Sequence, residues 1–207
     1  MSASPLALYG RGLHAGGLRL YQPDGAELDV PLARWIGRVD AAEEAVLGRA
    51  RGPVLDVGCG AGRHVLALQR RGVDVAGLDV SPDAVGLARS RGARAVHGSV
   101  FDRVDGVFRT LLLLDGNLGI GGDPVALLGR AQQLLVPGGA VLAEVGEPMA
   151  GSRRLALRLR LAHEVSYPFP WAVVGGADAD ALAGATGFAV ADRWRAGGRW
   201  FVELRRC

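Results

Sequence analysis

The chain has 207 residues, which is enough for one domain with a substantial core and too few for two comfortable ones. Its 49% hydrophobic and 22% charged residues, with a formal net charge of +3, are typical of a globular protein. All 24 basic residues are arginines dispersed along the chain, a pattern that argues against a broad nucleic-acid-binding surface and indicates the codon bias of a GC-rich bacterial genome.

The features that would place the chain outside the cytoplasm are missing from the sequence. The first residues lack a basic cluster followed by an apolar stretch, so we expect no signal peptide. No apolar run approaches the ~20 residues of a membrane span. Two distant cysteines, Cys59 and Cys207, cannot form a disulfide framework. We therefore expect a cytoplasmic protein that does not contact a membrane.

The first half of the chain predicts an arm, a helix and then alternating strands and helices. Residues 1–30 are rich in glycine and proline, and we expect an arm or lid with little regular structure. Apolar residues from Leu32 to Leu47 recur at helical spacing and predict one helix. Beyond it, we expect strands at 53–57, 73–80, 93–100, 108–116 and 140–147, with helices at 62–71, 82–90 and 124–135. This alternation predicts an α/β fold with a doubly wound, mostly parallel sheet.

The pattern changes after the fifth predicted strand. Leucines alternate with arginine or alanine over residues 155–162, as in a half-exposed strand. Residues 151–176 predict an insert that extends over the carboxyl-terminal edge of the sheet. A helix at 178–186 and a hairpin of 188–194 with 198–206 complete the chain.

A glycine-rich loop follows the first predicted strand, in the stretch VLDVGCGAGRH at 54–64. Asp56 stands near the strand end, and three glycines at alternate positions allow a ligand to approach the backbone: Gly58, Gly60 and Gly62. Asp79 closes the second strand, where a carboxylate usually binds the two hydroxyls of a ribose. Together these residues predict a site for a nucleoside-containing cofactor.

The spacing D-x-G-x-G-x-G differs from the G-x-G-x-x-G of dinucleotide-binding folds. An anionic Asp56 suits a ligand with an ammonium and a sulfonium, and it would repel a pyrophosphate. The motif resembles motif I of the class I S-adenosylmethionine-dependent methyltransferases. The phrase LLVPGGAVLAEV and the closing hairpin resemble the same family, so the likeness spans Trp35 to Arg205.

This resemblance implies a single methyltransferase domain over residues 1–207 with a seven-stranded sheet whose last strand is antiparallel. It implies an enzyme that transfers a methyl group from S-adenosylmethionine to a small-molecule acceptor and releases S-adenosylhomocysteine. Two alternatives are a protein that binds the donor without catalysis and a nicotinamide-dependent oxidoreductase. The chain has no lysine for the Tyr-Lys pair of an oxidoreductase. We expect a monomer or homodimer without a nucleic-acid partner.

The resemblance also implies which residues bind the donor. Asp56, Gly58 and Gly60 would hold its methionine end, Asp79 its ribose, and Asp102 its adenine amino group. Arg63 would pair with the donor carboxylate, or lie solvated on a helix; Asp102 would otherwise cap a turn. The full set of expected donor-binding residues is Asp56, Gly58, Gly60, Gly62, Arg63, Asp79, Val80, Val100, Phe101, Asp102 and Asp115.

Methyl transfer from a sulfonium depends mainly on positioning and desolvation, so we expect no metal site. Asp115 and Asn117 follow the fourth strand, at the edge where open parallel sheets bind ligands, although the glycines beyond them also fit a simple turn. Their string DGNL departs from the (D/N)PP(Y/F) signature of enzymes that methylate nucleobase amines. For an acceptor that must lose a proton, the candidate bases are His14, Glu144, Glu147 and His163.

The remaining histidines and the aromatic residues complete the set of candidates. His64 and His97 are expected to be structural. Five aromatic residues are expected either in the core or as walls of an apolar acceptor pocket: Tyr9, Trp35, Tyr167, Phe169 and Trp171.

Overall fold

The computed structural model describes residues 3–207, and its largest element is a twisted seven-stranded sheet. In spatial order its strands are β11 (Phe188–Ala196), β12 (Arg199–Arg206), β7 (Leu135–Val145), β6 (Phe108–Leu113), β3 (Val54–Val57), β4 (Val75–Asp79) and β5 (Ala95–His97). Strands β5, β4, β3, β6 and β7 are parallel, whereas β12 pairs antiparallel with β7 and with β11. The predicted doubly wound sheet with an antiparallel end is confirmed.

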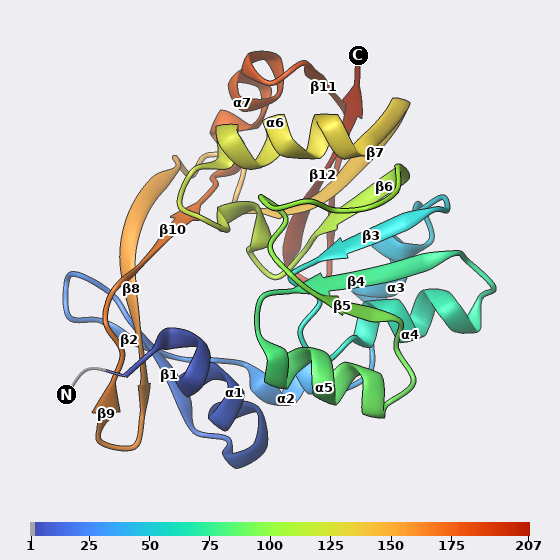
Figure 1. Ribbon diagram of the computed structural model, residues 1–207. Helices are drawn as coiled ribbons and strands as arrows, with labels where there is room; N and C mark the ends of the chain where they lie inside the picture. The colour runs from blue at the N-terminus through green and yellow to red at the C-terminus, as the bar shows by residue number, and fades with distance from the viewer. Residues whose placement is uncertain (1–2) are drawn as a thin grey trace.

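Helices cover both faces of this sheet (Figure 1). Helices α6 and α7 lie on one face, and α3, α4 and α5 lie on the other. Buried leucines and valines fill the two layers between helices and sheet. The helices are α3 (Ala41–Leu47), α4 (Arg63–Arg70), α5 (Pro82–Ser90), α6 (Pro124–Leu134) and α7 (Ala179–Ala185), with short 3-10 turns η1 (Asn117–Gly119) and η2 (Gly176–Asp178).

Local sequence explains where these helices begin. The Ser81 side chain accepts a hydrogen bond from the Ala84 amide at the start of α5. The Asp123 carboxylate accepts from the amides of Val125 and Ala126 at the start of α6. Both helices carry proline in their first turn, as predicted from the sequence.

The expected single helix between Leu32 and Leu47 is wrong, because the chain forms two. Helix α2 (Leu32–Ile36) ends at Gly37, and α3 begins after Asp40. Asp40 and Glu43 form a capping box, in which each side chain accepts a hydrogen bond from the other residue's amide. This local cap competes with continuation of the helical pattern, so the chain turns at Gly37.

The expectation of little regular structure in residues 1–30 is also wrong for the part that the structure describes. The arm forms α1 (Pro5–Ala15), β1 (Leu18–Tyr21) and β2 (Glu27–Asp29); residues 1–2 lie outside the described residues. It joins the insert in a second sheet. That sheet also contains β8 (Arg153–Leu161), β9 (Glu164–Val165) and β10 (Phe169–Val173).

The second sheet explains why the arm is ordered. Strand β1 pairs with both β2 and β8. It therefore provides hydrogen-bond partners for the backbone N–H and C=O groups of β8, an insert strand that is far away in sequence. Leucines of both segments, among them Leu18 and Leu159, pack with Leu8 and Leu13 of α1 in a third core. The alternation over residues 155–162 correctly predicts β8. Its pairing with β1, which joins Leu18 to Leu161, links distant parts of the chain, and local patterns do not reveal it.

Candidate functional site

The glycine loop lies at the carboxyl end of β3, between that strand and α4. Gly58, Gly60 and Gly62 have φ values of 72°, 52° and 79°, in the left-handed region that favours glycine. A Cβ atom at Gly58 would lie 2.6 Å from the Asn117 side-chain nitrogen, and one at Gly62 would lie 2.7 Å from the Ala93 methyl group. Gly58 and Gly62 are therefore required by close packing, while a Cβ atom at Gly60 would lie 3.2 Å from the hydroxyl oxygen of Tyr9.

Asp79 anchors the loop to the next strand. Its two carboxylate oxygens accept hydrogen bonds of 2.8 Å from the amides of Gly60 and Ser81. Burial raises the pKa of Asp79, and these two hydrogen bonds oppose that rise. Each carboxylate oxygen keeps a second lone pair, so Asp79 can still accept hydrogen bonds from a ligand.

The residues around the end of β4 differ in exposure. Val80 and Phe101 are each 44% exposed although they are apolar, whereas Val100 belongs to the core cluster and is 3% exposed. Phe101 is therefore the better candidate than Val100 for contact with a ligand ring. Asp102 lies in the exposed turn after β5; its amide donates to the Ser99 carbonyl, and its carbonyl accepts from Arg130.

A buried charge cluster lies beside the loop. The Arg63 guanidinium donates to Glu43 at 2.7 Å and to Asp115 at 2.5 Å, and its side chain is 4% exposed. The alternative of a solvated helix-face arginine is therefore wrong. Glu43, His64 and Asp115 lie close enough together to form a metal-ligand set, but the Arg63 guanidinium already neutralises two of these residues.

His64 extends the cluster toward the glycine loop. Its imidazole nitrogens lie 3.5 Å from an Asp56 oxygen and 3.8 Å from a Glu43 oxygen, distances of ion pairs rather than hydrogen bonds. Burial lowers the pKa of His64, but the nearby carboxylates outweigh it and raise this pKa to about 9. His64 is thus structural, as expected, and the Asp56 carboxylate faces the protein interior rather than the loop surface.

Asp115 is positioned by contacts on every side. Its φ of 56° is unusual for a residue with a side chain, and its amide donates to Glu144 at 2.9 Å. Arg34 of α2 donates to its carboxylate at 2.7 Å, opposite Arg63. Two guanidinium groups therefore hold this carboxylate in place from opposite sides.

Asn117 and Glu144 contact the backbone of neighbouring segments. The Asn117 amide nitrogen donates to the carbonyls of Val57 and Gly58 at 2.9 and 3.0 Å, so Asn117 fixes the start of the glycine loop. Burial raises the pKa of Glu144, and Arg199 of β12, at 3.4 Å, opposes that rise. Glu147, by contrast, is exposed.

Helix α1 covers the glycine loop. Burial, followed by the negative charge of Asp79, raises the pKa of the Tyr9 hydroxyl, so Tyr9 stays protonated at neutral pH. Its ring makes an edge contact with Trp35 of α2 at 6.5 Å between centroids. A Cβ atom at Gly10 would lie 1.8 Å from an Asp83 oxygen, which shows how closely α1 approaches α5.

The insert contributes a second wall. Trp171 of β10 pairs with Ile120 just after η1, and its ring makes an edge contact with Phe169 at 6.2 Å. The partly exposed aromatic residues Tyr9, Trp35, Phe169 and Trp171 therefore come from segments that cover the carboxyl edge of β3 and β6, whereas Tyr167 is exposed.

The other candidate bases lie apart from this cluster. His14 is exposed near the end of α1, and His163 is exposed in the turn between β8 and β9. His97, in β5, contacts the Val80 carbonyl at 3.1 Å.

Sequence reasoning missed three charged residues of the site: Arg34, Glu43 and Arg199. The D-x-x-E capping box identifies Glu43 as a helix-start residue only, and its burial depends on the packing of α3 against α4. Nothing local marks the two arginines.

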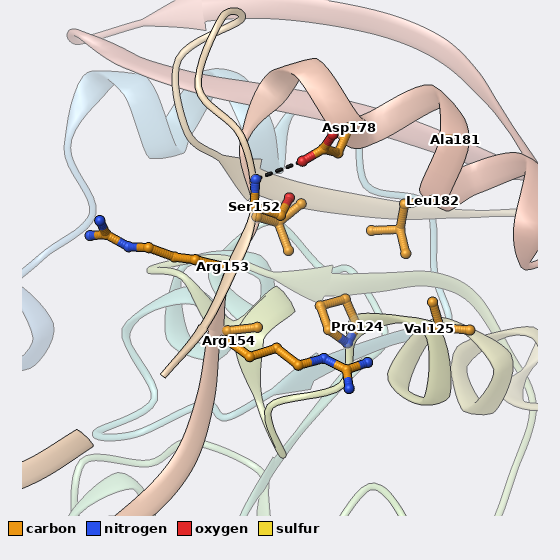
Figure 2. Close-up of a pocket in the computed structure, with 10 residues that line it drawn as sticks. Pro124, Val125, Ser152, Arg153, Arg154, Asp178, Ala181 and Leu182 are labelled. Atoms are coloured by element: carbon orange, nitrogen blue, oxygen red, sulfur yellow. Dashed lines mark hydrogen bonds between the residues drawn. The ribbon is translucent and has the colours of Figure 1, made fainter. Parts of the chain in front are cut away.

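A cavity of about 280 Å³ lies outside this cluster, between the insert and helices α6 and α7. Figure 2 shows Arg154 extending toward Pro124 at the start of α6, and Ser152 bound to Asp178. Arg154 forms an ion pair with Asp123 at 3.1 Å. None of the predicted site residues lines this cavity.

Comparisons with known proteins agree with this geometry. Residues 54–139 match the model of a methyltransferase domain family. A S-adenosylmethionine-dependent methyltransferase from Bacteroides fragilis, solved with S-adenosylhomocysteine, is 25% identical, with a TM-score of 0.81. That alignment covers 97% of this chain and 94% of the other.

Two more distant structures share the fold. A 1,6-didemethyltoxoflavin-N1-methyltransferase from Burkholderia thailandensis is 21% identical, with a TM-score of 0.58 over 80% of this chain and 78% of its own. A sugar N-methyltransferase from Streptoalloteichus is 19% identical, with a TM-score of 0.57 over 80% and 85%. In the family match over residues 54–139, the antiparallel end of the sheet and the glycine loop, this chain is similar to the class I S-adenosylmethionine-dependent methyltransferases.

Proposed function

We propose that the chain transfers a methyl group from S-adenosylmethionine to a small-molecule acceptor bound between the glycine loop and the second sheet. The observation that carries this proposal is the loop itself. Gly60 is a glycine with positive φ, tied to Asp79 and overlain by Tyr9. The methyltransferase neighbour that covers nearly the whole chain was solved with S-adenosylhomocysteine.

The residues present fit this donor. Asp79 has free lone pairs for the ribose hydroxyls, and the exposed apolar side chains of Val80 and Phe101 offer surfaces for the adenine. The backbone of Gly58 and Gly60 would hold the methionine end, while Asp56 supports the loop from the interior through His64. When bound, the donor supplies an electrophilic methyl group, and the protein needs mainly to position it and exclude water.

The acceptor would contact the aromatic walls and the edge between Asn117 and Glu144. Because Arg34 and Arg63 neutralise Asp115, we assign this residue to positioning rather than to proton transfer. Glu144 is the base candidate that the site favours: burial raises its pKa toward neutrality, where a carboxylate removes a proton more readily. His14 and His163 lack a comparable contact with the loop.

Small-molecule chemistry is supported by size and surroundings. The arm and insert together form a small sheet over the site, and two of the neighbours named above are a sugar N-methyltransferase and a 1,6-didemethyltoxoflavin-N1-methyltransferase. Among residues 3–207, none of the helices has the length and apolarity needed to cross a membrane. From composition we propose a bacterial cytoplasmic enzyme that works as a monomer or homodimer.

Titration calorimetry of the purified protein against S-adenosylmethionine, S-adenosylhomocysteine and NAD tests the donor. We expect saturable binding of the first two and none of NAD. Incubation with donor labelled in its methyl group and a panel of amines, phenols and carboxylates then tests transfer. Binding of NAD alone would contradict the proposal. Tight donor binding would also contradict it if the protein neither transferred the methyl group to any acceptor nor slowly hydrolysed the donor.

A further inference from the structure

A second cavity lies at the opposite end of the main sheet from the glycine loop. Its volume is about 460 Å³, within the range of about 300–1,000 Å³ that is common for small-ligand sites. It is bounded by the loop after α3, the start of β6, the turn at 136–139 and the end of β12. Four arginines and one carboxylate line it: Arg49, Arg51, Arg109, Arg205 and Glu203.

The charges in this cavity do not balance. Arg49 pairs with Asp192 at 2.6 Å and with Glu203 at 3.5 Å, and Arg205 also pairs with Glu203. Within residues 3–207, the Arg109 side chain has neither a hydrogen bond nor an ion pair. Arg51 donates only to the carbonyls of Gly48 and Ala50. Four positive charges therefore face two negative ones, and two guanidinium groups have no carboxylate partner.

Hydrogen bonds to the sheet hold the backbone of Arg51 and Arg109 in place. The buried Thr110 hydroxyl accepts from the Arg51 amide and donates to the Arg51 carbonyl, both at 2.9 Å. The Arg109 amide donates to the Pro53 carbonyl at 2.8 Å. Two adjacent residues of β6 thus anchor the backbone of Arg51 and Arg109 beside the same cavity, and both side chains are exposed to a ligand.

We propose that this cavity binds a small phosphorylated molecule. Guanidinium groups present paired N–H donors that match the oxygens of a phosphate, and unpaired arginines in a concave surface attract a dianion more strongly than a single carboxylate. The site is distinct from the methyl-donor loop, because Arg109 lies at the start of β6 (Phe108–Leu113), whereas Asp115 follows the opposite end of that strand.

Calorimetry with pyrophosphate at constant ionic strength tests the proposal. The parent should show saturable binding, and Arg109→Ala should weaken it by about tenfold or more. Arg51→Ala provides a second variant, and melting curves show whether each variant folds. The matched control is Arg103→Ala, which removes an equal charge from a 90% exposed side chain outside the cavity and should leave binding unchanged.

Glu203→Gln should change the affinity for pyrophosphate in the opposite direction. It removes the carboxylate that Arg49 and Arg205 share, so pyrophosphate should bind several-fold more tightly. Absence of saturable binding by the parent would overturn the proposal, and so would equal losses in the Arg109 and Arg103 variants. A 12-nucleotide single-stranded DNA carries the same phosphate chemistry; if it binds more tightly than pyrophosphate and depends on Arg109, the small-molecule assignment is wrong.

Discussion

At the scale of single residues, Asp79 is the side chain on which we expect donor binding to depend most. Asp79→Ala removes the acceptor of the Gly60 and Ser81 amides and the proposed ribose contact. A hydrogen bond to a charged group contributes about 1.5–3 kcal/mol, so donor affinity should fall about tenfold or more. Calorimetry with S-adenosylhomocysteine measures this change. Asp105→Ala, in an exposed loop, serves as a control; unchanged affinity in a folded Asp79 variant would disprove the ribose assignment.

Substitutions of Asn117 and Asp115 should affect different properties, the first donor affinity and the second turnover. Asn117→Ala leaves the Val57 and Gly58 carbonyls without their donor, so the loop loosens and donor affinity should fall several-fold. Asp115→Asn leaves Arg34 and Arg63 facing each other across a neutral side chain, which should lower turnover far more than donor affinity. Donor calorimetry beside single-turnover transfer distinguishes the two. Identical profiles for both variants would contradict these roles.

At the scale of elements, the contact between α1 and α5 should control access to the donor. Gly10→Ala would place a methyl group against Asp83, so α1 must move away and lift Tyr9 from Gly60. We expect weaker donor binding and faster donor dissociation, measured by stopped-flow fluorescence. Gly86→Ala is the matched control: it lies in α5 with open space around it, and should raise stability by about 0.5–1 kcal/mol without changing donor affinity. Equal dissociation rates in both variants would contradict a covering role for α1.

Elements with strong local signals were predictable, and those that depend on distant pairing were not. Ser81 and Asp123 identify the starts of α5 and α6, and the left-handed Gly72 follows the end of α4. The donor loop was predictable for the same reason, because its glycines and Asp79 belong to one β-α-β unit. Arg34 reaches Asp115 only through the packing of α2, and β1 joins the insert through its pairing with the distant β8, so local sequence carried no signal for either contact.

At the scale of the whole molecule, the buried charge cluster joins elements that are distant in sequence. Glu43 of α3 meets Arg63 and His64 of α4, and Arg199 of β12 approaches Glu43 at 3.4 Å. His64 in turn faces Asp56 of β3. The fold therefore depends on the charge of one buried imidazole, which makes its global stability depend on pH.

The sign of that dependence follows from the raised pKa of His64. Below about pH 6.5 the imidazole is protonated in both the folded and the unfolded chain, and the stabilisation is fully present. As pH rises toward the folded-state pKa of about 9, the unfolded chain loses the proton first and the stabilisation disappears. The free energy of unfolding should thus fall by roughly 1–3 kcal/mol between pH 6.5 and 9, measured by urea denaturation. Burial also raises the pKa values of Tyr9 and Cys59. Tyr9 acts above this window, but the unfolded Cys59 thiol loses its proton from about pH 8.5 and adds to the fall at the upper end.

His64→Gln should be less stable at pH 6.5 and nearly independent of pH up to about 8, whereas the exposed His14→Gln should behave like the parent. A His64 variant with the parent's slope would show that the imidazole is neutral throughout, with Asp56 and Glu43 balanced by the arginines alone.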